Sequence, residues 1–235
     1  MNRGRMLLVG ALCVAAGAAV GAVVATRTTL GNPRYVPVYH VLVSADGMTL
    51  ATTDASCGGG PVWVSETATT VTLRRPDSRA HVQGVCAVES YTVRLKAPLG
   101  NRTLIDAATG RTVPIFDGAR ILRPAHLPAG FSHVYDTANF DEADEQPAGP
   151  GCVQVYVKDG EYDDTLLIAQ TVGGAPDVPD GVRPTRVTVH GHPGTAFPGE
   201  VEWTEDGQLI TITSMTYAYA VLPTSELVAV GDSLG

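Results

Sequence analysis

The chain has 235 residues, with 16 basic and 24 acidic side chains and a formal net charge of −8. This acidic balance argues against nucleic acid and against an anionic membrane surface as partners, since both require basic patches. The length, together with 26 Gly and 16 Pro residues and short alternating Val and Thr stretches, favours one large or two small mostly β domains.

An uncharged segment of twenty residues, 6–25, lies near the N-terminus, directly after Arg3 and Arg5. As a helix rising about 1.5 Å per residue, it would match the hydrocarbon core of a bilayer, roughly 30 Å thick. The two arginines favour the cytoplasmic side. The sequence therefore predicts a single-pass membrane anchor, with the bulk of the chain outside the cytoplasm.

A cleaved secretory signal is the alternative interpretation of this segment. Small residues over 17–22 offer a cleavage site, although signal cores are shorter, at about 7–15 apolar residues. Cleavage would make the protein secreted instead of anchored. Both interpretations export the same domains, which carry 14 basic and 24 acidic residues.

Three cysteines, Cys57, Cys86 and Cys152, lie in the exported part, where disulfides persist. A Cys57–Cys86 disulfide, favoured over the alternative pairings with Cys152, would close a loop of about 30 residues and stabilise the fold by roughly 3–4 kcal/mol. Cys152 is then the odd thiol. It is expected to be buried as a small hydrophobe or to form an intermolecular link.

The first exported domain is expected to be a small β-sandwich. Apolar residues repeat at period two, as in Tyr91, Val93 and Leu95, which predicts strands with one buried face. Short strands of this kind separated by turns are typical of a sandwich. The expected strands are 38–43, 48–53, 62–66, 71–74, 91–95, 103–106 and 111–113.

The second exported domain is expected to be α+β. Strands are predicted at 153–157, 165–171 and 185–190, and a hairpin pairs 200–204 with 208–214 across an Asp-Gly turn. Thr224 is the predicted N-cap of a short C-terminal helix, 225–230, with Gly231 as its stop. The expected division is a cytoplasmic head (1–5), a transmembrane helix (6–25), a tether (26–37), a β-sandwich-like domain (38–117) and a curved-sheet α+β domain (118–235).

Two short stretches of the first domain carry a family resemblance. They are Tyr-Thr-Val-Arg-Leu-Lys-Ala-Pro-Leu-Gly-Asn-Arg at 91–102 and Ile-Asp-Ala-Ala-Thr-Gly at 105–110, accompanied by Cys57 and Cys86. With them the domain resembles a recurrent exported β module of high-GC bacterial envelope proteins. The resemblance covers about a third of the chain. It implies an architecture and no known chemistry.

The second domain carries its own short motifs, at 127–131, 187–192, 200–203, 209–212 and 222–234. With these it resembles a C-terminal domain of unknown function from bacterial envelope proteins, also found in anti-sigma-factor-like and lipoprotein-sorting-like proteins. The resemblance implies a curved antiparallel sheet with a helix, and a hydrophobic ligand or protein partner. It carries over no catalytic residue.

Two groups of residues in the sequence could supply metal ligands. His190 and His192 have the spacing that places two imidazoles on one face of a strand, but no third ligand lies nearby in sequence. Acidic clusters at 141–145 and 161–164 offer oxygen ligands for calcium but lack EF-hand spacing. We therefore expect neither a metal nor a cofactor.

Sequence motifs give little support to catalysis, since the chain has no Gly-x-Ser-x-Gly elbow, no His-Glu-x-x-His and no P-loop. Trp203, Tyr217 and Tyr219 are candidates for a ligand groove or partner surface, with core packing as the alternative. The expected function is a non-enzymatic, membrane-anchored binding or interaction module of the cell envelope. The alternative is a lipid or lipoprotein carrier with an apolar groove on the C-terminal sheet.

Overall fold

The computed structural model describes residues 35–54, 60–77, 89–139, 149–176, 181–216 and 221–235. Within these ranges the chain forms three β-sheets and one α-helix, so the fold is mostly β, as predicted. No helix in these ranges is long and apolar enough to cross a membrane. The predicted anchor at 6–25 and the predicted Cys57–Cys86 disulfide lie outside the described residues.

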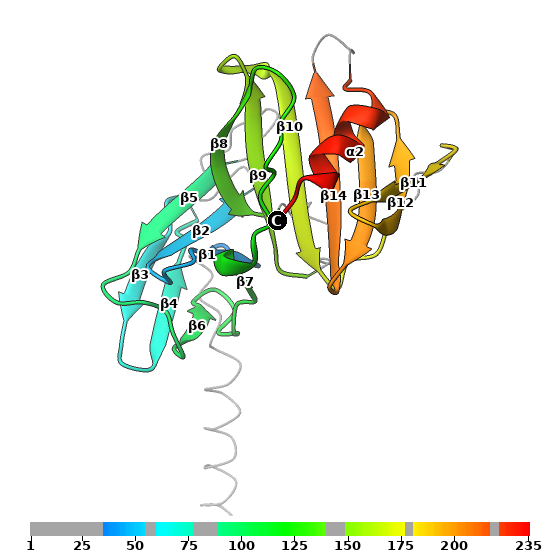
Figure 1. Ribbon diagram of the computed structural model, residues 1–235. Coiled ribbons are helices and arrows are strands. Elements are labelled where there is room, and N and C mark those ends of the chain that lie inside the picture. The colour runs from blue at the N-terminus through cyan, green and yellow to red at the C-terminus, as the bar shows by residue number, and fades with distance from the viewer. Residues whose placement is uncertain (1–34, 55–59, 78–88, 140–148, 177–180, 217–220) are drawn as a thin grey trace, which may run out of the picture.

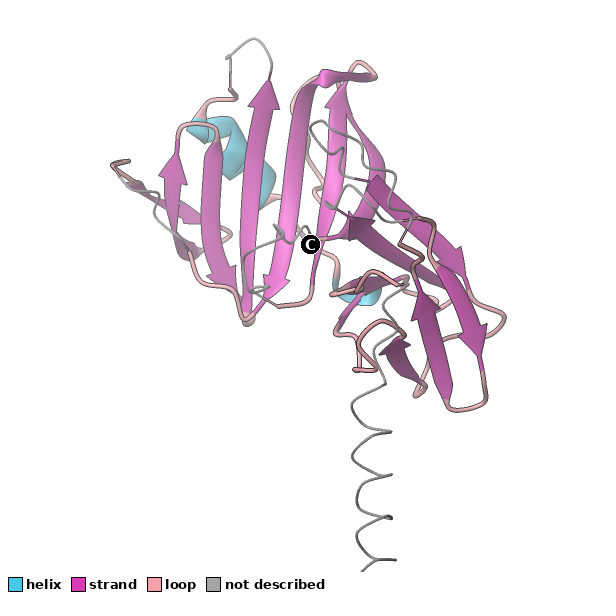
Figure 2. Ribbon diagram, turned by 180° about the vertical axis from the view of Figure 1, so that it is seen from behind, coloured by secondary structure: helices cyan, strands magenta, loops and turns pink. Residues whose placement is uncertain are grey.

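The first unit consists of a four-stranded sheet, ordered β5-β2-β1-β7, and a three-stranded sheet, ordered β3-β4-β6. The three-stranded sheet lies farther from the large sheet of the second unit (Figures 1 and 2). The strands are β1 (Val41–Val43), β2 (Thr49–Asp54), β3 (Trp63–Glu66), β4 (Thr70–Arg74), β5 (Glu89–Arg94), β6 (Thr103–Asp106) and β7 (Ile115–Asp117). The prediction missed β7, and the predicted strand at 111–113 is reduced to an isolated bridge between Thr112 and Ile105.

The two sheets of this unit pack face to face around one apolar core. Val41, Val43 and Leu50 from the four-stranded sheet belong to the same buried cluster as Val71 and Leu73 from the three-stranded one. The alternating residues of the 91–95 segment also pack against this cluster, as their period predicts. Local alternation therefore predicts the buried face of these strands correctly.

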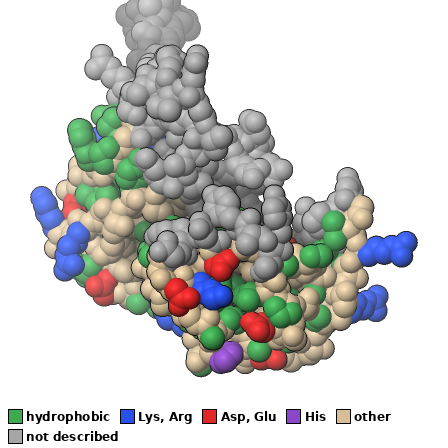
Figure 3. Space-filling model, turned by 90° about the horizontal axis from the view of Figure 1, so that it is seen from above, with side chains coloured by type: hydrophobic (Ala, Val, Ile, Leu, Met, Phe, Trp, Pro, Cys, Tyr) green, Lys and Arg blue, Asp and Glu red, His purple; other side chains and the backbone are tan. Residues whose placement is uncertain are grey.

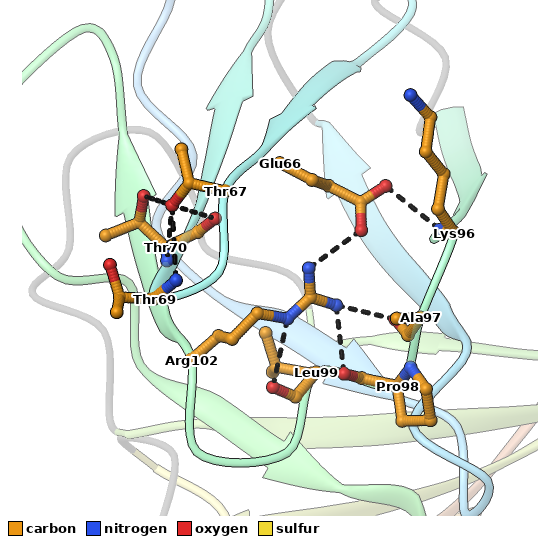
Figure 4. A network of polar contacts seen from close by, with 9 residues as sticks. All are labelled: Glu66, Thr67, Thr69, Thr70, Lys96, Ala97, Pro98, Leu99 and Arg102. Atoms are coloured by element: carbon orange, nitrogen blue, oxygen red, sulfur yellow. Dashed lines mark hydrogen bonds and ion pairs between the residues drawn. The ribbon is translucent and has the colours of Figure 1, made fainter.

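The stretch 91–102, which carries the resemblance to envelope modules, ends in a turn held by one arginine (Figure 4). The Arg102 guanidinium donates to the carbonyl oxygens of Ala97 (2.5 Å) and Pro98 (2.9 Å) and lies 2.8 Å from the Glu66 carboxylate. Glu66 also accepts the backbone N–H of Lys96 at 2.9 Å. These hydrogen bonds, that from Arg102 first, hold the pKa of Glu66 below its usual range.

The second motif of that resemblance, 105–110, also builds a turn. The buried carboxylate of Asp106 accepts the backbone N–H of Thr109 (2.9 Å), its hydroxyl (2.7 Å) and the N–H of Ala108 (3.2 Å). Gly110 follows with a φ of +70°, a conformation that glycine adopts without steric cost. Both motifs thus specify backbone turns, which accounts for them without any chemistry.

The second unit is built on a seven-stranded antiparallel sheet, ordered β11-β12-β13-β14-β10-β9-β8. Its strands are β8 (Phe131–Ala138), β9 (Gly151–Lys158), β10 (Glu161–Val172), β11 (Thr185–Val189), β12 (His192–Phe197), β13 (Glu200–Glu205) and β14 (Gln208–Thr216). The predicted hairpin across Asp206-Gly207 is β13–β14, and both turn residues have positive φ. Strands β8 and β12 were not predicted.

The C-terminal helix α2 spans Thr224–Asp232, and both of its predicted ends are wrong. Pro223 occupies the N-cap position without a side-chain cap, so Thr224 is the first helical residue. Gly231 lies inside the helix instead of stopping it. A Cβ at Gly231 would lie 2.4 Å from Val189 Cγ1 and 3.1 Å from the Trp203 ring, so this glycine allows the helix to approach the sheet closely.

Helix α2 and the last residues cover the inner face of the large sheet (Figure 1). Leu227, Val230 and Leu234 form one buried cluster with residues on β10, β13 and β14, among them Trp203 and Ile212. Gly194 on β12 pairs with Trp203, and a Cβ at Gly194 would lie 2.7 Å from the carbonyl oxygen of Glu202 and 3.2 Å from Trp203 Cβ. The inner face is thus occupied by the chain's own C-terminal segment.

The four-stranded sheet of the first unit is the middle layer of the molecule. One face of β1 contributes Val41 and Val43 to the first core, whereas Leu42 joins Phe116 of β7 in another buried cluster with Ala138 and Cys152 of the large sheet. Because both faces of β1 are buried, it has three consecutive buried apolar residues. This cluster, the apolar seam, joins the two units.

Candidate functional site: the cleft between the two β units

Hydroxyl groups continue the apolar seam between the units. The Thr53 hydroxyl on β2 donates to the carbonyl oxygen of Ala138 (2.7 Å) and lies 2.6 Å from the Thr137 hydroxyl on β8. Ser90 on β5 donates to the same Thr137 hydroxyl at 3.1 Å. Hydrogen bonds therefore join both β2 and β5 to β8, and β2 also makes apolar contact with it through Ala51.

A cleft of about 260 Å³ lies between the two units. Its lining combines small apolar side chains, three hydroxyls and one pair of opposite charges. The lining residues are Leu42, Ser44, Ala45, Thr49, Ala51, Thr92, Gly118, Ile121, Arg123 and Asp136. The first unit, the connecting segment and β8 each contribute to this lining, so the cleft exists only when the two units are joined.

The charged wall of the cleft is an ion pair. Arg123 Nη2 lies 2.5 Å from Asp136 Oδ2, and His133 Nε2 lies 2.7 Å from the other carboxylate oxygen. The hydrogen bond to Asp136 raises the pKa of Arg123. The side chain of Arg123 is still 50% exposed, so the guanidinium can also meet a partner at the rim.

Two buried glutamines fix the segment that carries this wall. Gln154 on β9 donates to the carbonyl oxygen of Leu122 (2.8 Å), and the side-chain oxygen of Gln170 on β10 accepts the Leu122 N–H (3.1 Å). The backbone N–H and C=O of Arg123 pair with those of Gly235, each at 3.2 Å. The wall is therefore held in place before any partner binds, which lowers the entropic cost of binding.

The other end of the connecting segment is fixed by a close backbone approach. The 3-10 turn η1 (Gly118–Arg120) begins after Asp117, whose carboxylate accepts the Ala119 N–H at 2.9 Å. A Cβ at Gly118 would lie 2.4 Å from the carbonyl oxygen of Val43. Only glycine allows η1 to lie this close to the end of β1, where the floor of the cleft forms.

Of the aromatic residues predicted for a ligand or partner surface, Trp203 is described, and it does not line the cleft. Trp203 is fully buried, and its indole N–H donates to Glu205 at 3.1 Å. Trp203 therefore packs in the core, which was the alternative interpretation, and its indole is not available at the surface. Tyr217 and Tyr219 lie outside the described residues.

His190 and His192 do come together, around Glu205. His190 Nδ1 lies 3.0 Å from Glu205 Oε1, and His192 Nε2 lies 3.6 Å from the same atom. Burial alone would raise the pKa of Glu205, but hydrogen bonds from Trp203 and His190 lower it overall. The Asp232 carboxylate accepts the His190 N–H at 2.6 Å, so this polar cluster ties two strand turns to α2.

Metal binding gains no support from this arrangement. Within the described part of the chain, no group of three His, Cys, Asp or Glu residues is placed to hold a metal ion. The acidic loop at 141–145, considered for calcium, lies outside that part. The other acidic group lies on β10, where Asp164 Oδ2 is 3.9 Å from Lys158 Nζ.

Cys152 takes the first of its two predicted roles, that of a small buried hydrophobe. The thiol is free and fully buried in the apolar seam, and burial raises its pKa to about 12. At pH 8 only about one such thiol in ten thousand is ionised. We expect iodoacetamide to leave Cys152 unmodified in the folded chain and to alkylate it in guanidinium, as measured by peptide mass spectrometry. Similar alkylation rates in both states would contradict the buried seam.

The residues of the cleft were missed at the sequence level. One signal for Arg123 does exist, since residues 118–235 contain 5 basic and 17 acidic side chains. A cation is therefore rare in this domain. No comparable sequence signal marks Ser44, Thr49 and Thr92 as cleft residues, because Ser and Thr are common in β-strands.

No family model matches this chain, and no curated protein sequence matches it either.

Proposed function

We propose that this chain is a membrane-anchored, extracytoplasmic envelope protein that acts as a non-enzymatic binding module, with the cleft between its two β units as the partner site. The observation that carries this proposal is the preformed cleft. The apolar seam joins the units, and the buried glutamines fix the wall bearing Arg123.

The size and lining of the cleft favour a protein partner. Its volume of about 260 Å³ is slightly below the range of ligand pockets, about 300–1,000 Å³. A side chain or tight turn inserted from a partner fits this space. The three hydroxyls and Arg123 can accept or donate hydrogen bonds around it.

The surface charge is consistent with such a partner. Seen from above, the molecule shows side chains of both signs interspersed with apolar ones, with no single-sign patch over the visible described surface (Figure 3). Interfaces of this mixed character are typical of non-obligate protein complexes.

The inner face of the large sheet favours a protein partner over the alternative of a lipid carrier. An apolar groove there would require open space beside Trp203, which instead lies fully buried with Leu227 and Val230 of α2. An acyl chain would have to displace both the helix and the segment held by Gln154 and Gln170. Such a rearrangement would expose apolar surface that is now buried, which costs free energy. Binding in the cleft requires no such exposure.

Site-specific photo-crosslinking of the full chain in its native membranes tests this proposal. A benzophenone amino acid replaces Thr92, which is exposed and lines the cleft, or Thr204, which is exposed on β13 and serves as the control. We expect a discrete polypeptide adduct from position 92 and none from position 204. Adding Ala45→Trp, which fills the cleft, should remove the adduct.

Three results would count against the proposal. Equal adducts from the two positions, or none from position 92, would contradict the cleft as the binding site. A lipid adduct from position 92, identified by its mass, would favour the carrier instead.

A further inference from the structure

The outer face of the three-stranded sheet carries an exposed tryptophan. Trp63 begins β3 and pairs with Arg74, while Ser65 pairs with Thr72, so all four side chains share one face. Ile105 of β6 lies beside Thr72 on this face. The side chains of Val64 and Leu73 point the other way, into the core. Trp63 is 60% exposed, the largest value among the exposed large apolar side chains of the described residues.

The chain enters the fold at the end of β4, the strand that carries Arg74. Tyr35, the first described residue, forms a bridge with Pro76, and the Val36 N–H donates to the carbonyl oxygen of Arg75 at 2.8 Å. Pro76 lies two residues beyond Arg74, so the entry point continues the strand on which Arg74 lies. An aromatic side chain thus stands at the entry as well as on the face.

The length of the tether places this corner near the bilayer. Nine residues, 26–34, separate Tyr35 from the predicted membrane segment. Even fully extended, they span at most about 30 Å. Tyr35 therefore stays within that distance of the membrane surface, and the neighbouring sheet face can reach it.

The two units differ in net charge, and this difference affects how each would interact with a membrane surface. Residues 38–117 contain 7 basic and 7 acidic side chains, whereas residues 118–235 contain 5 basic and 17 acidic ones. The acidity that argues against an anionic surface therefore belongs to the second unit alone. Electrostatic repulsion would keep the second unit away from anionic lipids and leave the neutral first unit beside them.

We propose that the outer face of the three-stranded sheet rests on the lipid headgroups, with the Trp63 indole at the interface and Arg74 beside lipid phosphates. This inference rests on the anchor of the proposed function. Tryptophan prefers the membrane–water interface because its ring is apolar and its N–H is polar. Arg74 donates to Ser65 at 2.6 Å with Nη1, and a guanidinium has five N–H donors.

Tryptophan fluorescence of the full chain in vesicles tests this contact directly. The chain has two tryptophans, and none lies in the anchor segment. Trp203 is fully buried in the second unit and serves as the internal reference. In phosphatidylcholine vesicles brominated near the headgroup end of the acyl chains, we expect the emission of Trp63 to fall by about twofold relative to unbrominated vesicles. The Trp63→Phe variant should show no fall.

A charge-reversal pair sharpens the test. Arg74→Glu places a carboxylate against the lipid phosphates and should abolish the quenching of Trp63. The matched control is Arg94→Glu, since Arg94 is an exposed residue of β5 on the other sheet of the same unit. That control should quench like the unmodified chain.

The possible outcomes distinguish the proposed contact of the sheet face with lipid from the proposed membrane anchor. An alkaline wash of the same vesicles reports whether the chain is retained. A retained chain with unquenched Trp63 overturns the proposed face and leaves the anchor in place. A chain released by the wash overturns both, and quenching that is unaffected by Arg74→Glu overturns the placement of Arg74.

Discussion

Replacing Trp203 by alanine is expected to lower the free energy of unfolding by about 3–5 kcal/mol, the range for large aromatic residues removed from a core. The indole is fully buried, and Gly231 of α2 packs directly against its ring. Its removal leaves a cavity that α2 cannot close without bending. It also removes the N–H that Glu205 accepts.

Urea unfolding of the full chain in detergent, followed by circular dichroism, measures this loss. The other tryptophan provides a control of the same chemistry, since Trp63 is 60% exposed. Trp63→Ala should change the free energy of unfolding by no more than about 0.5 kcal/mol. Equal losses for the two variants would refute the placement of Trp203 in the core.

Phe116→Ala is also expected to lower the free energy of unfolding by about 3–5 kcal/mol, because it opens a cavity at the junction of the two units. Phe116 is only 1% exposed and packs with Leu42 and Cys152 in the apolar seam between the units. Its loss should therefore weaken the joint between the two units and the cleft beside it. We expect the variant to unfold at lower urea and to lose the crosslink from position 92.

The neighbouring residue is the matched control for this variant. Ile115 lies on the same short strand but is 44% exposed, so Ile115→Ala should have a much smaller effect and should keep the crosslink. A folded Phe116→Ala chain that crosslinks normally would show that the seam does not shape the cleft.

Many of the strands were predictable because their signals come from residues that are close together in the sequence. Alternating residues such as Val93 and Leu95 reveal a buried face without knowledge of what covers it. The Asp206-Gly207 turn identifies its hairpin because both residues adopt a positive φ that few other pairs accept. These features need only neighbours in sequence.

The missed strand β12 shows the limit of local patterns. Pro193 and Gly194 argue against a strand, and His190-Gly191 suggests that the preceding strand ends in a turn. That turn does form, but the chain then returns as β12. Glycine suits position 194 because a Cβ there would lie 2.7 Å from the carbonyl oxygen of Glu202, on the next strand.

The cleft was not predictable for a related reason. Its lining comes from strands near residues 42–51, from β5 and from the segment around Arg123, which no spacing rule connects. The three apolar residues of β1 do indicate burial. They do not indicate that Leu42 faces a different sheet from Val41 and Val43, which is the fact that creates the seam.

The covering of the large sheet by the last residues of the chain has a consequence for the order of folding. Leu227, Val230 and Leu234 close the core over Trp203, so the second unit cannot bury that residue until residue 234 has been synthesised. Until then the apolar residues of β13 and β14 that pack under α2 stay exposed, a state prone to aggregation. The first unit, complete by Asp117, has all its core residues available much earlier. Folding during synthesis should therefore proceed in two stages, with the second stage waiting for the C-terminal helix.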